Sequence, residues 1–343
     1  MKMDFSRELE RYHDDYVTLL KEQQDEMRER RNCNRSRIIN NIDKKYAISE
    51  KSFVIQGSYA MHTMVQDKEN DYDIDDGIKI DENLLVNEYS RKLTPSEAKS
   101  LIHDIFKDDS RFKDKPSIEK NCVRIKYCEG YHVDIPVYKE TNEGLKLAGK
   151  DDWEETDPKG VTSWFNHAVK DKSPNDDNDQ MRRVVRLFKS FIRNNEKEGD
   201  DVPSGFIISK LVDEVYGSID NKDKERLDST FLSTGRRILN RLNKDLTIEH
   251  PVLEGKMLVD FGKTSKTEFF RRLLNDKIKE YDSNISKMSN THYENVIKSW
   301  GILFNAKEEF EKVGKSFIGP SKLASENLVK VEKEGALGGY ACA

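Results

Sequence analysis

The chain has 343 residues and a formal net charge of −5, with charged residues at 36% and hydrophobic residues at 35%. No apolar run approaches the roughly 18 residues that a membrane-spanning helix needs, and the first residues lack the apolar segment of a signal peptide, so we expect a cytoplasmic protein without a membrane partner. The acidic balance argues against a large nonspecific surface for duplex DNA. Four cysteines without C-x-x-C spacing favour free thiols over disulfides or zinc.

A long helix is predicted at the N-terminal end, over residues 4 to about 31. Its apolar side chains recur at steps of three and four on an otherwise charged segment, so we expect a strut that lies across the protein. A second helical piece follows around residues 38–42. The apolar stripe consists of Phe5, Leu9, Tyr12, Tyr16 and Leu19.

From about residue 50 to residue 140 the chain changes to the alternating pattern of strands. Glu129-Gly130 separates two alternating runs and indicates a hairpin. Pro136 cannot donate a backbone hydrogen bond, so it argues that its strand lies near a sheet edge or ends there. The predicted strands are 52–56, 71–80 and the two arms of 117–139.

A helix with a clear start interrupts these strands at residues 94–106. Thr94 can cap it, Pro95 suits its first position, and Glu97 completes a capping box. The pattern turns helical beyond residue 160 and stays so. Further helices are predicted at 206–216, 222–242, 267–281 and 291–311.

One predicted helix, over about residues 182–193, has an apolar stripe on one face and a basic stripe on the other. By default, such a basic stripe is a solvated helix face, and Arg182 and Arg193 are expected at the surface. The basic stripe consists of Arg182, Arg186, Lys189 and Arg193.

These patterns together predict an α+β protein. A mixed lobe of strands and helices is followed by a helical lobe, and the long N-terminal helix braces them. The tail has no clear period and is predicted to be disordered. The predicted boundaries are 1–45 for the brace, 46–160 for the mixed lobe, 161–318 for the helical lobe and 319–343 for the tail.

The most informative stretch is QGSYAMHTMVQDKENDYDIDDG, residues 56–77. Asp73 and Asp75 stand two apart on a predicted strand, so both carboxylates point to the same face. Adjacent like charges are costly unless a cation lies between them, and Mg²⁺, with Mn²⁺ as the alternative, prefers oxygen ligands. Asp76 points to the other face and is not expected to be a ligand.

Two further features turn this pair into a candidate site. If a helix begins at Gly57-Ser58, its free amides and the Ser58 hydroxyl form a seat for a phosphate. A third carboxylate would complete a two-metal site, and Asp134, on a strand that could lie near the Asp73 strand, is the best candidate. Asp-x-Asp alone is commonly a solvated acidic turn, whereas this whole combination is far rarer.

In this order the elements resemble the DNA polymerase β-like nucleotidyltransferase superfamily. Within it they resemble the bacterial cGAS/DncV-like nucleotidyltransferases, which make cyclic oligonucleotide signals in anti-phage (CBASS) defence. The resemblance spans about residues 50–210 and implies a polymerase β-like nucleotidyltransferase core with a helical C-terminal lobe. It rests on QGS at 56–58, DIDDG at 73–77, RIK and HVDIPVY within 124–138, TDPKGVTSWFN at 156–166, RRVVRLFKSF at 182–191 and PSG at 203–205.

The resemblance also implies roles for single residues. Asp73 and Asp75 would hold both metals, and Asp134 would help to activate the attacking ribose hydroxyl. DncV-like chains can carry a base-stacking aromatic residue near position 61, where this chain has Met61, so the base preference stays open. The implied nucleotide-binding residues are Gln56 and Met61, Gly57 and Ser58 at the triphosphate, Lys189 and Ser204 at the phosphates, and Arg124 and Asp157 at a base or its ribose.

The expected reaction condenses two nucleoside triphosphates, ATP and GTP in the first instance, into a cyclic dinucleotide similar to cyclic GMP-AMP. Two alternatives stay open: transfer of a single nucleotide onto a protein or RNA end, and a non-catalytic nucleotide-binding regulator. The resemblance also suggests a partner enzyme similar to ubiquitin-transfer enzymes, which would join the C-terminus to a target. The end GGYACA suits that chemistry and makes Ala343 a candidate conjugation site.

Overall fold

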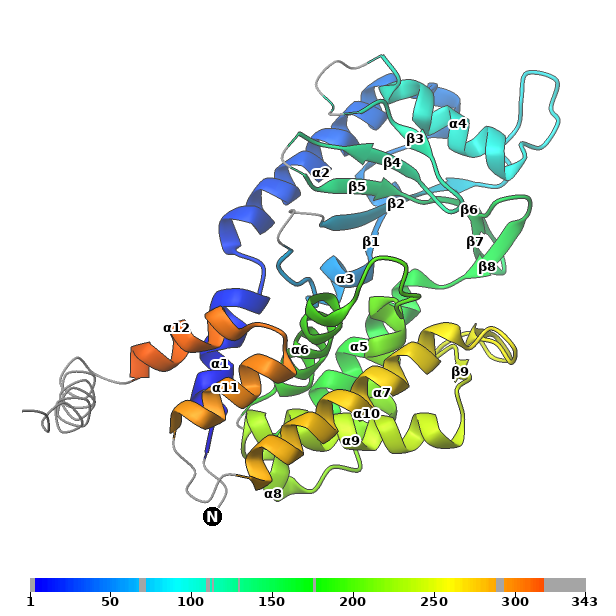
Figure 1. The fold of residues 1–343 in the computed structure, drawn as a ribbon. Coiled ribbons are helices and arrows are strands. Elements are labelled where there is room, and N and C mark those ends of the chain that lie inside the picture. Colours follow the sequence, from blue (N-terminus) through cyan, green and yellow to red (C-terminus); the bar gives the residue numbers. More distant parts are fainter. Residues whose placement is uncertain are drawn as a thin grey trace, which may run out of the picture.

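The computed structural model describes residues 4–67, 72–108, 112, 114–128, 130–174, 177–287 and 293–317. These residues form one lobe built on a mixed sheet and one lobe built of helices, joined by the N-terminal helices (Figure 1). The predicted α+β class and the bracing role of the N-terminal segment are confirmed. Within the described ranges, no helix has the length and apolar character that crossing a membrane requires.

The N-terminal brace is two helices, so the prediction of one continuous helix over residues 4–31 is wrong. Helix α1 (Ser6–Tyr12) continues as a π-helical turn, and the backbone then becomes extended at Thr18 before α2 (Lys21–Asn41) begins. At this break the amide of Gln66 donates to the carbonyl of Val17 over 2.8 Å. A continuous helix would use that carbonyl internally, so the pairing with the passing segment favours the break.

The two helices of the brace contribute to different hydrophobic cores. Leu9 and Tyr12 of α1, and Phe5 directly before it, are buried in the core of the helical lobe. Met27 and Ile38 of α2 are buried in the core of the sheet lobe. Because burial of apolar surface is the main stabilising term in folding, each lobe holds one end of the brace.

The sheet lobe is organised around one long central strand, β2 (Asp73–Asp81). Strand β1 (Phe53–Gln56) pairs antiparallel with β2, whereas β5 (His132–Ile135) and β6 (Val137–Thr141) both pair parallel with it. Pro136 separates β5 from β6 inside the sheet, so it marks a strand end and not an edge. The other strands, β3 (Ser117–Ile118), β4 (Val123–Lys126), β7 (Gly144–Ala148) and β8 (Trp153–Thr156), complete the order β3-β4-β5-β2-β6-β7-β8.

Helix α4 (Pro95–Phe106) begins as its sequence predicts. The Thr94 hydroxyl accepts a hydrogen bond from the Glu97 amide, and the Glu97 carboxylate accepts one from the Thr94 amide over 2.8 Å. Its buried side chains, which include Ile102 and Phe106, share a core with α2 and the sheet. The capping box therefore fixes where this helix begins against the sheet.

The helical lobe differs from the predicted segments at two turns. The predicted helix 222–242 is two helices, α8 and α9, and the predicted helix 291–311 is two helices, α11 and α12. The second break lies at Asn305, whose φ of 50° is a left-handed conformation that asparagine tolerates well and a helix excludes. The lobe contains α5 (Pro158–Lys172), α6 (Gln180–Asn195), α7 (Gly205–Tyr216), α8 (Asn221–Lys224), α9 (Leu227–Lys244), α10 (Ser265–Ser286), α11 (Tyr293–Leu303) and α12 (Lys307–Phe317).

A small hairpin that the sequence did not predict, β9 (Ile248–Glu249) and β10 (Met257–Val259), interrupts these helices.

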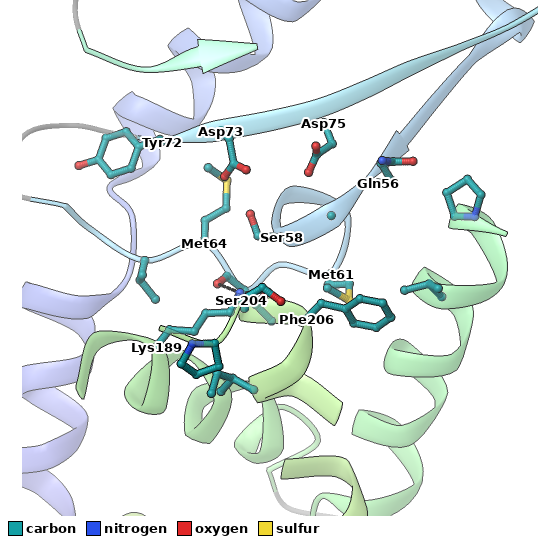
Figure 2. Close-up of a pocket in the computed structure, with 18 of the residues that line it drawn as sticks. Gln56, Ser58, Met61, Met64, Tyr72, Asp73, Asp75, Lys189, Ser204 and Phe206 are labelled. Carbon is teal, nitrogen blue, oxygen red and sulfur yellow. Dashed lines mark hydrogen bonds between the residues drawn. The ribbon is translucent and has the colours of Figure 1, made fainter. Parts of the chain in front are cut away.

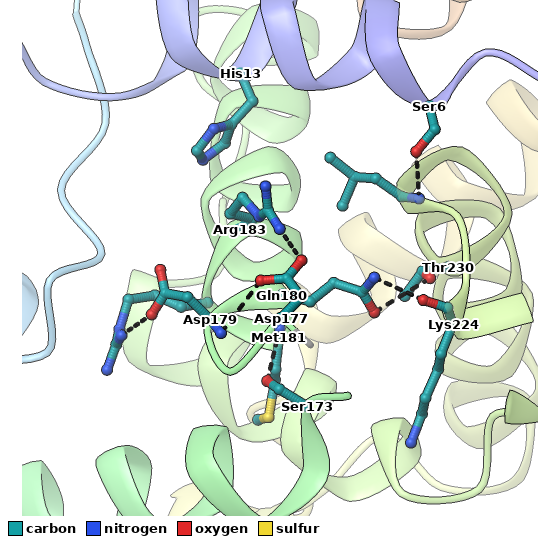
Figure 3. Close-up of polar contacts among 12 residues, drawn as sticks. Ser6, His13, Ser173, Asp177, Asp179, Gln180, Met181, Arg183, Lys224 and Thr230 are labelled. Carbon is teal, nitrogen blue, oxygen red and sulfur yellow. Dashed lines mark hydrogen bonds and ion pairs between the residues drawn. The ribbon is translucent and has the colours of Figure 1, made fainter. Parts of the chain in front are cut away.

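The start of α6 is held by a buried polar network (Figure 3). The Gln180 side chain donates to the Lys224 carbonyl over 2.7 Å and accepts from the Tyr216 hydroxyl over 2.6 Å. Satisfied buried polar groups specify one arrangement, so this network sets the position of α6 in the lobe.

Candidate functional site

The predicted glycine-serine turn is the short helix α3 (Gly57–Ala60), which follows β1 directly. Gly57 has a φ of +64°, and a Cβ built on it would stand 2.0 Å from Oδ2 of Asp75. Both the left-handed backbone and the close approach require glycine here. The register explains the approach, because Gln56 is the β1 partner of Asp75.

Asp73 and Asp75 project from β2 into one cavity of about 610 Å³, as the two-residue spacing predicted (Figure 2). Burial, and then the charges of Asp73 and Asp134, raise the pKa of Asp75 well above its usual range. Asp76 points to the opposite face, where its carboxylate pairs with the Arg35 guanidinium at 2.5 and 2.7 Å. The prediction that the Asp76 side chain points to the face opposite Asp73 and Asp75 is confirmed.

Asp134 is the neighbour of Asp75 in the parallel ladder between β2 and β5. In the structure its carboxylate forms two hydrogen bonds with Arg124, at 2.8 and 2.7 Å. This pairing raises the pKa of Arg124 further above its usual range. Asp75, Asp134 and Arg124 line a second cavity of about 400 Å³.

No group of three His, Cys, Asp or Glu side chains stands ready as a complete metal site within the described ranges. Asp73 and Asp75 nevertheless supply the oxygen ligands that Mg²⁺ and Mn²⁺ prefer. Their mutual repulsion in a buried position, seen in the raised pKa of Asp75, is the kind of cost that a bound divalent cation relieves. The chemistry of these two side chains therefore fits such an ion.

The wall opposite the carboxylates comes from the helical lobe. Lys189 of α6 and Ser204, which caps α7, face the same cavity as Ser58 (Figure 2). The Lys189 ammonium donates to the Thr63 carbonyl and hydroxyl over 2.9 and 2.8 Å. Burial lowers the pKa of Lys189 to about 7.

The basic stripe on α6 is not a solvated face, and the prediction of a surface position for Arg182 and Arg193 is wrong. Arg182 donates to the Met61 carbonyl over 2.9 Å, and each following member of the stripe reaches a carbonyl further along residues 61–66. We call residues 61–66 the latch segment. The donors and acceptors are Arg182 to Met61, Arg186 to His62, Lys189 to Thr63, and Arg193 to Val65 and Gln66.

Of the remaining predicted residues, Gln56, Met61 and Asp157 lie in or beside the larger cavity. Gln56 and Met61 line the larger cavity, and Gln56 accepts a hydrogen bond from the Tyr138 hydroxyl. Asp157 instead caps α5, where its carboxylate accepts from the Gly160 amide over 2.8 Å, while its neighbours Thr156 and Pro158 line the cavity. Ala343 lies outside the described residues.

Sequence reasoning missed several side chains of the larger cavity. Phe206 follows the predicted Ser204 by two residues, and Tyr72 directly precedes Asp73, so nearness to a motif was a usable signal for both. His250 carried no such signal, because it belongs to the unpredicted hairpin. The missed lining residues with aromatic rings are Tyr72, Tyr138, Phe206 and His250.

Comparison with known proteins agrees with this geometry. Residues 51–138 match the family model "Cyclic GMP-AMP synthase DncV-like, nucleotidyltransferase domain". A curated Cyclic GMP-AMP synthase of Escherichia albertii is 28% identical over 212 residues. That alignment covers 60% of this chain and 45% of the relative, so it spans less than half of that protein.

Solved structures share the fold over most of the chain. The crystal structure of the Vibrio cholerae DncV cyclic AMP-GMP synthase has a TM-score of 0.69 at 17% identity, covering 90% of this chain and 98% of that one. The 3′-deoxy GTP bound form of Escherichia coli DncV has a TM-score of 0.64 at 17% identity, covering 89% and 98%. The family match contains the Gly57 turn and all three carboxylates, so residues 51–138 are similar to the nucleotidyltransferase domain of DncV-like cyclic GMP-AMP synthases.

Proposed function

We propose that this protein condenses nucleoside triphosphates, releases pyrophosphate and closes a cyclic dinucleotide. One observation carries the proposal: two adjacent carboxylates, Asp73 and Asp75, face Lys189 and Ser204 across a single cavity beside a glycine-serine turn. Carboxylates on one wall and the Lys189 ammonium on the opposite wall suit a triphosphate with its metal ions. ATP and GTP are the proposed substrates, and a product similar to cyclic GMP-AMP is the proposed outcome.

The chain's own residues bind and orient the donor nucleotide. The turn at Gly57 and Ser58 offers backbone amides and a hydroxyl to the triphosphate, and Lys189 supplies a positive charge from the opposite wall. A divalent cation held by Asp73 and Asp75 would supply charge neutralisation at the phosphate that is attacked. The walls from two lobes hold the reacting groups in line, which removes much of the entropic cost of a reaction between separate molecules.

The second cavity is the proposed place of the acceptor nucleotide. It meets the larger cavity at Asp75, and it contains Asp134. We propose that the Asp134 carboxylate accepts the proton of the attacking ribose hydroxyl. Each carboxylate oxygen of Asp134 accepts one hydrogen bond from Arg124 and keeps a second lone pair that the ribose hydroxyl can use.

Incubation of the purified protein with Mg²⁺ and all four triphosphates, one of them labelled at a time, tests the proposal. A phosphatase-resistant product with the mass of a cyclic dinucleotide supports it, and the label pattern identifies the bases. Labelled protein or RNA would instead indicate transfer of a single nucleotide. Nucleotide binding without pyrophosphate release would indicate a regulator.

We further propose that the product is a signal in bacterial anti-phage (CBASS) defence. This extension rests on the similarity to DncV-like synthases and on no single contact in the structure. The product should accumulate in producing cells after phage infection, and protection should be lost with the Asp73→Asn, Asp75→Asn double variant. Equal survival of cells with either protein would contradict the defence role without touching the enzymatic proposal.

A further inference from the structure

The larger cavity has a polar part and a more apolar part. The polar part holds the carboxylates, Ser58 and Lys189, whereas Phe206 points away from Lys189 toward Met61 (Figure 2). Such a division suits a nucleotide, whose triphosphate is charged and whose base has an apolar face and a polar edge. The apolar part is lined by Met61, Pro158, Val161, Phe206 and His250.

His250 is held in one tautomer by the loop that follows it. Its Nδ1 accepts the backbone amides of Val252 and Leu253, over 3.1 and 2.9 Å. A nitrogen that accepts two N–H groups carries no proton, so the proton of the neutral ring is on Nε2. Burial, and then the Lys256 charge, lower the pKa of His250, which keeps the ring neutral near pH 7.

The orientation of the His250 ring is fixed as well. The ring meets Phe206 edge to face, with centroids 5.5 Å apart and planes at 85°. The loop behind it is anchored to both lobes, since the Lys256 carbonyl accepts from the His250 amide and the Lys256 ammonium donates to the Glu155 carbonyl. Val252 adds a contact beside Gly160 at the start of α5.

Nε2–H therefore lies on the ring edge away from the loop, and within the described ranges no group accepts a hydrogen bond from it. A single oriented donor on the wall of a ligand cavity recognises an acceptor and rejects a second donor, because a buried polar group without a partner is costly.

We propose that His250 reads the nucleobase: its Nε2–H donates to a ring nitrogen or carbonyl oxygen on the base edge, while Phe206 packs against the base. The inference rests on the proposed nucleotide site and adds a specificity-determining residue to it. Bases that present an acceptor to this edge are favoured, and bases that present an amino group there are disfavoured.

The sharpest variant is His250→Asn. The Asn amide oxygen can take the place of Nδ1 and keep the loop amides paired, but Asn has no atom at the place of Nε2. The exposed His167 on α5 offers a matched control, His167→Asn. Calorimetry would measure the dissociation constants of the four nonhydrolysable triphosphates and of inorganic triphosphate, which has no base.

We expect His250→Asn to weaken the preferred nucleotide by about tenfold, the effect of losing one hydrogen bond, and to flatten the ranking of the four bases. Inorganic triphosphate should bind as before, and His167→Asn should change nothing. Purine analogues that each lack one ring nitrogen give an independent measurement on the wild-type protein. If the acceptor is a ring nitrogen, one analogue should lose the same factor on the wild type and lose nothing further on His250→Asn.

An unchanged base ranking in His250→Asn would overturn the inference. So would an equal loss for inorganic triphosphate, because a contact to the base leaves that ligand unaffected. If the wild type binds nucleotides and His250→Asn shows either of these two results, only the proposed role of His250 is overturned. A wild-type protein that binds no nucleotide overturns the proposed function as well.

Discussion

The carboxylate of Asp75 lies directly against the backbone of Gly57, so closely that a Cβ on Gly57 would stand 2.0 Å from Oδ2. The turn that is proposed to bind phosphate and the strand that carries the carboxylates are therefore in contact. The contact follows from the pairing of β1 with β2, in which Gln56 faces Asp75. A change on one side of this contact is transmitted to the other.

Gly57→Ala should abolish activity and reduce stability. The new methyl group would collide with Asp75, and the positive φ of this position alone costs alanine about 1–3 kcal/mol of unfolding free energy. Chemical denaturation and product formation would measure the two effects. Gly199→Ala is the matched control, since Gly199 also has a positive φ but has open space around it. Equal activity of the two variants would contradict the proposed contact.

Asp75→Asn should remove product formation while making the metal-free protein more stable. Burial and the charges of Asp73 and Asp134 raise the pKa of Asp75, so its ionised form destabilises the folded state above the ordinary carboxyl pKa, and the neutral amide removes that cost. Thermal unfolding in a chelator should show a higher midpoint for the variant. Added Mg²⁺ should raise the midpoint of the wild type more than that of the variant. A lower midpoint for the variant in the chelator would show that the charge is not a cost.

Lys189 should take up a proton when a triphosphate binds. Burial lowers the pKa of Lys189 to about 7, and a polyanion beside the amine would raise it again. At pH 8 binding of inorganic triphosphate should therefore consume close to one proton, and at pH 6 far less. Calorimetry in buffers of different ionisation enthalpy measures this uptake, and Lys189→Met should eliminate it.

The same shift predicts the pH dependence of stability. The unfolded chain holds a proton on Lys189 up to its ordinary pKa of about 10.5, whereas the folded chain releases it at about 7. Between these values the unfolded state binds more protons, so the free energy of unfolding should rise with pH across this window. The difference in unfolding free energy between the wild type and Lys189→Met, measured by denaturation from pH 7 to 10, checks the sign. No change in that difference across the window would contradict the lowered pKa.

Arg186→Ala should loosen the latch segment. Arg186 makes two hydrogen bonds to the His62 carbonyl, at 2.9 and 2.6 Å, and His62 has a positive φ of 53° that needs such support. Hydrogen bonds to a charged group contribute about 1.5–3 kcal/mol, so amide exchange in residues 61–66 should accelerate and triphosphate affinity should fall. The exposed Arg272→Ala, on α10, is the control. Unaltered exchange in the latch segment would refute its dependence on Arg186.

Local regularities were enough to predict several features. Asp73 and Asp75 share a face, and Asp76 does not, because side chains alternate along any strand. The start of α4 follows from Thr94 and Glu97, whose hydrogen bonds span three residues. These outcomes depend on neighbours in sequence, so no knowledge of the rest of the fold was needed.

Other features were decided only by the tertiary structure, because their partners are distant in sequence. The basic stripe of α6 has the spacing of a solvated face, and only the packing of the two lobes brings the latch segment against it. The pairing of Asp134 with Arg124 depends on the register of β4 and β5. His250 lines the cavity because it belongs to a hairpin that no pattern in the sequence predicts. Local residue patterns therefore identify which groups can do the chemistry, whereas long-range packing decides what each of them faces.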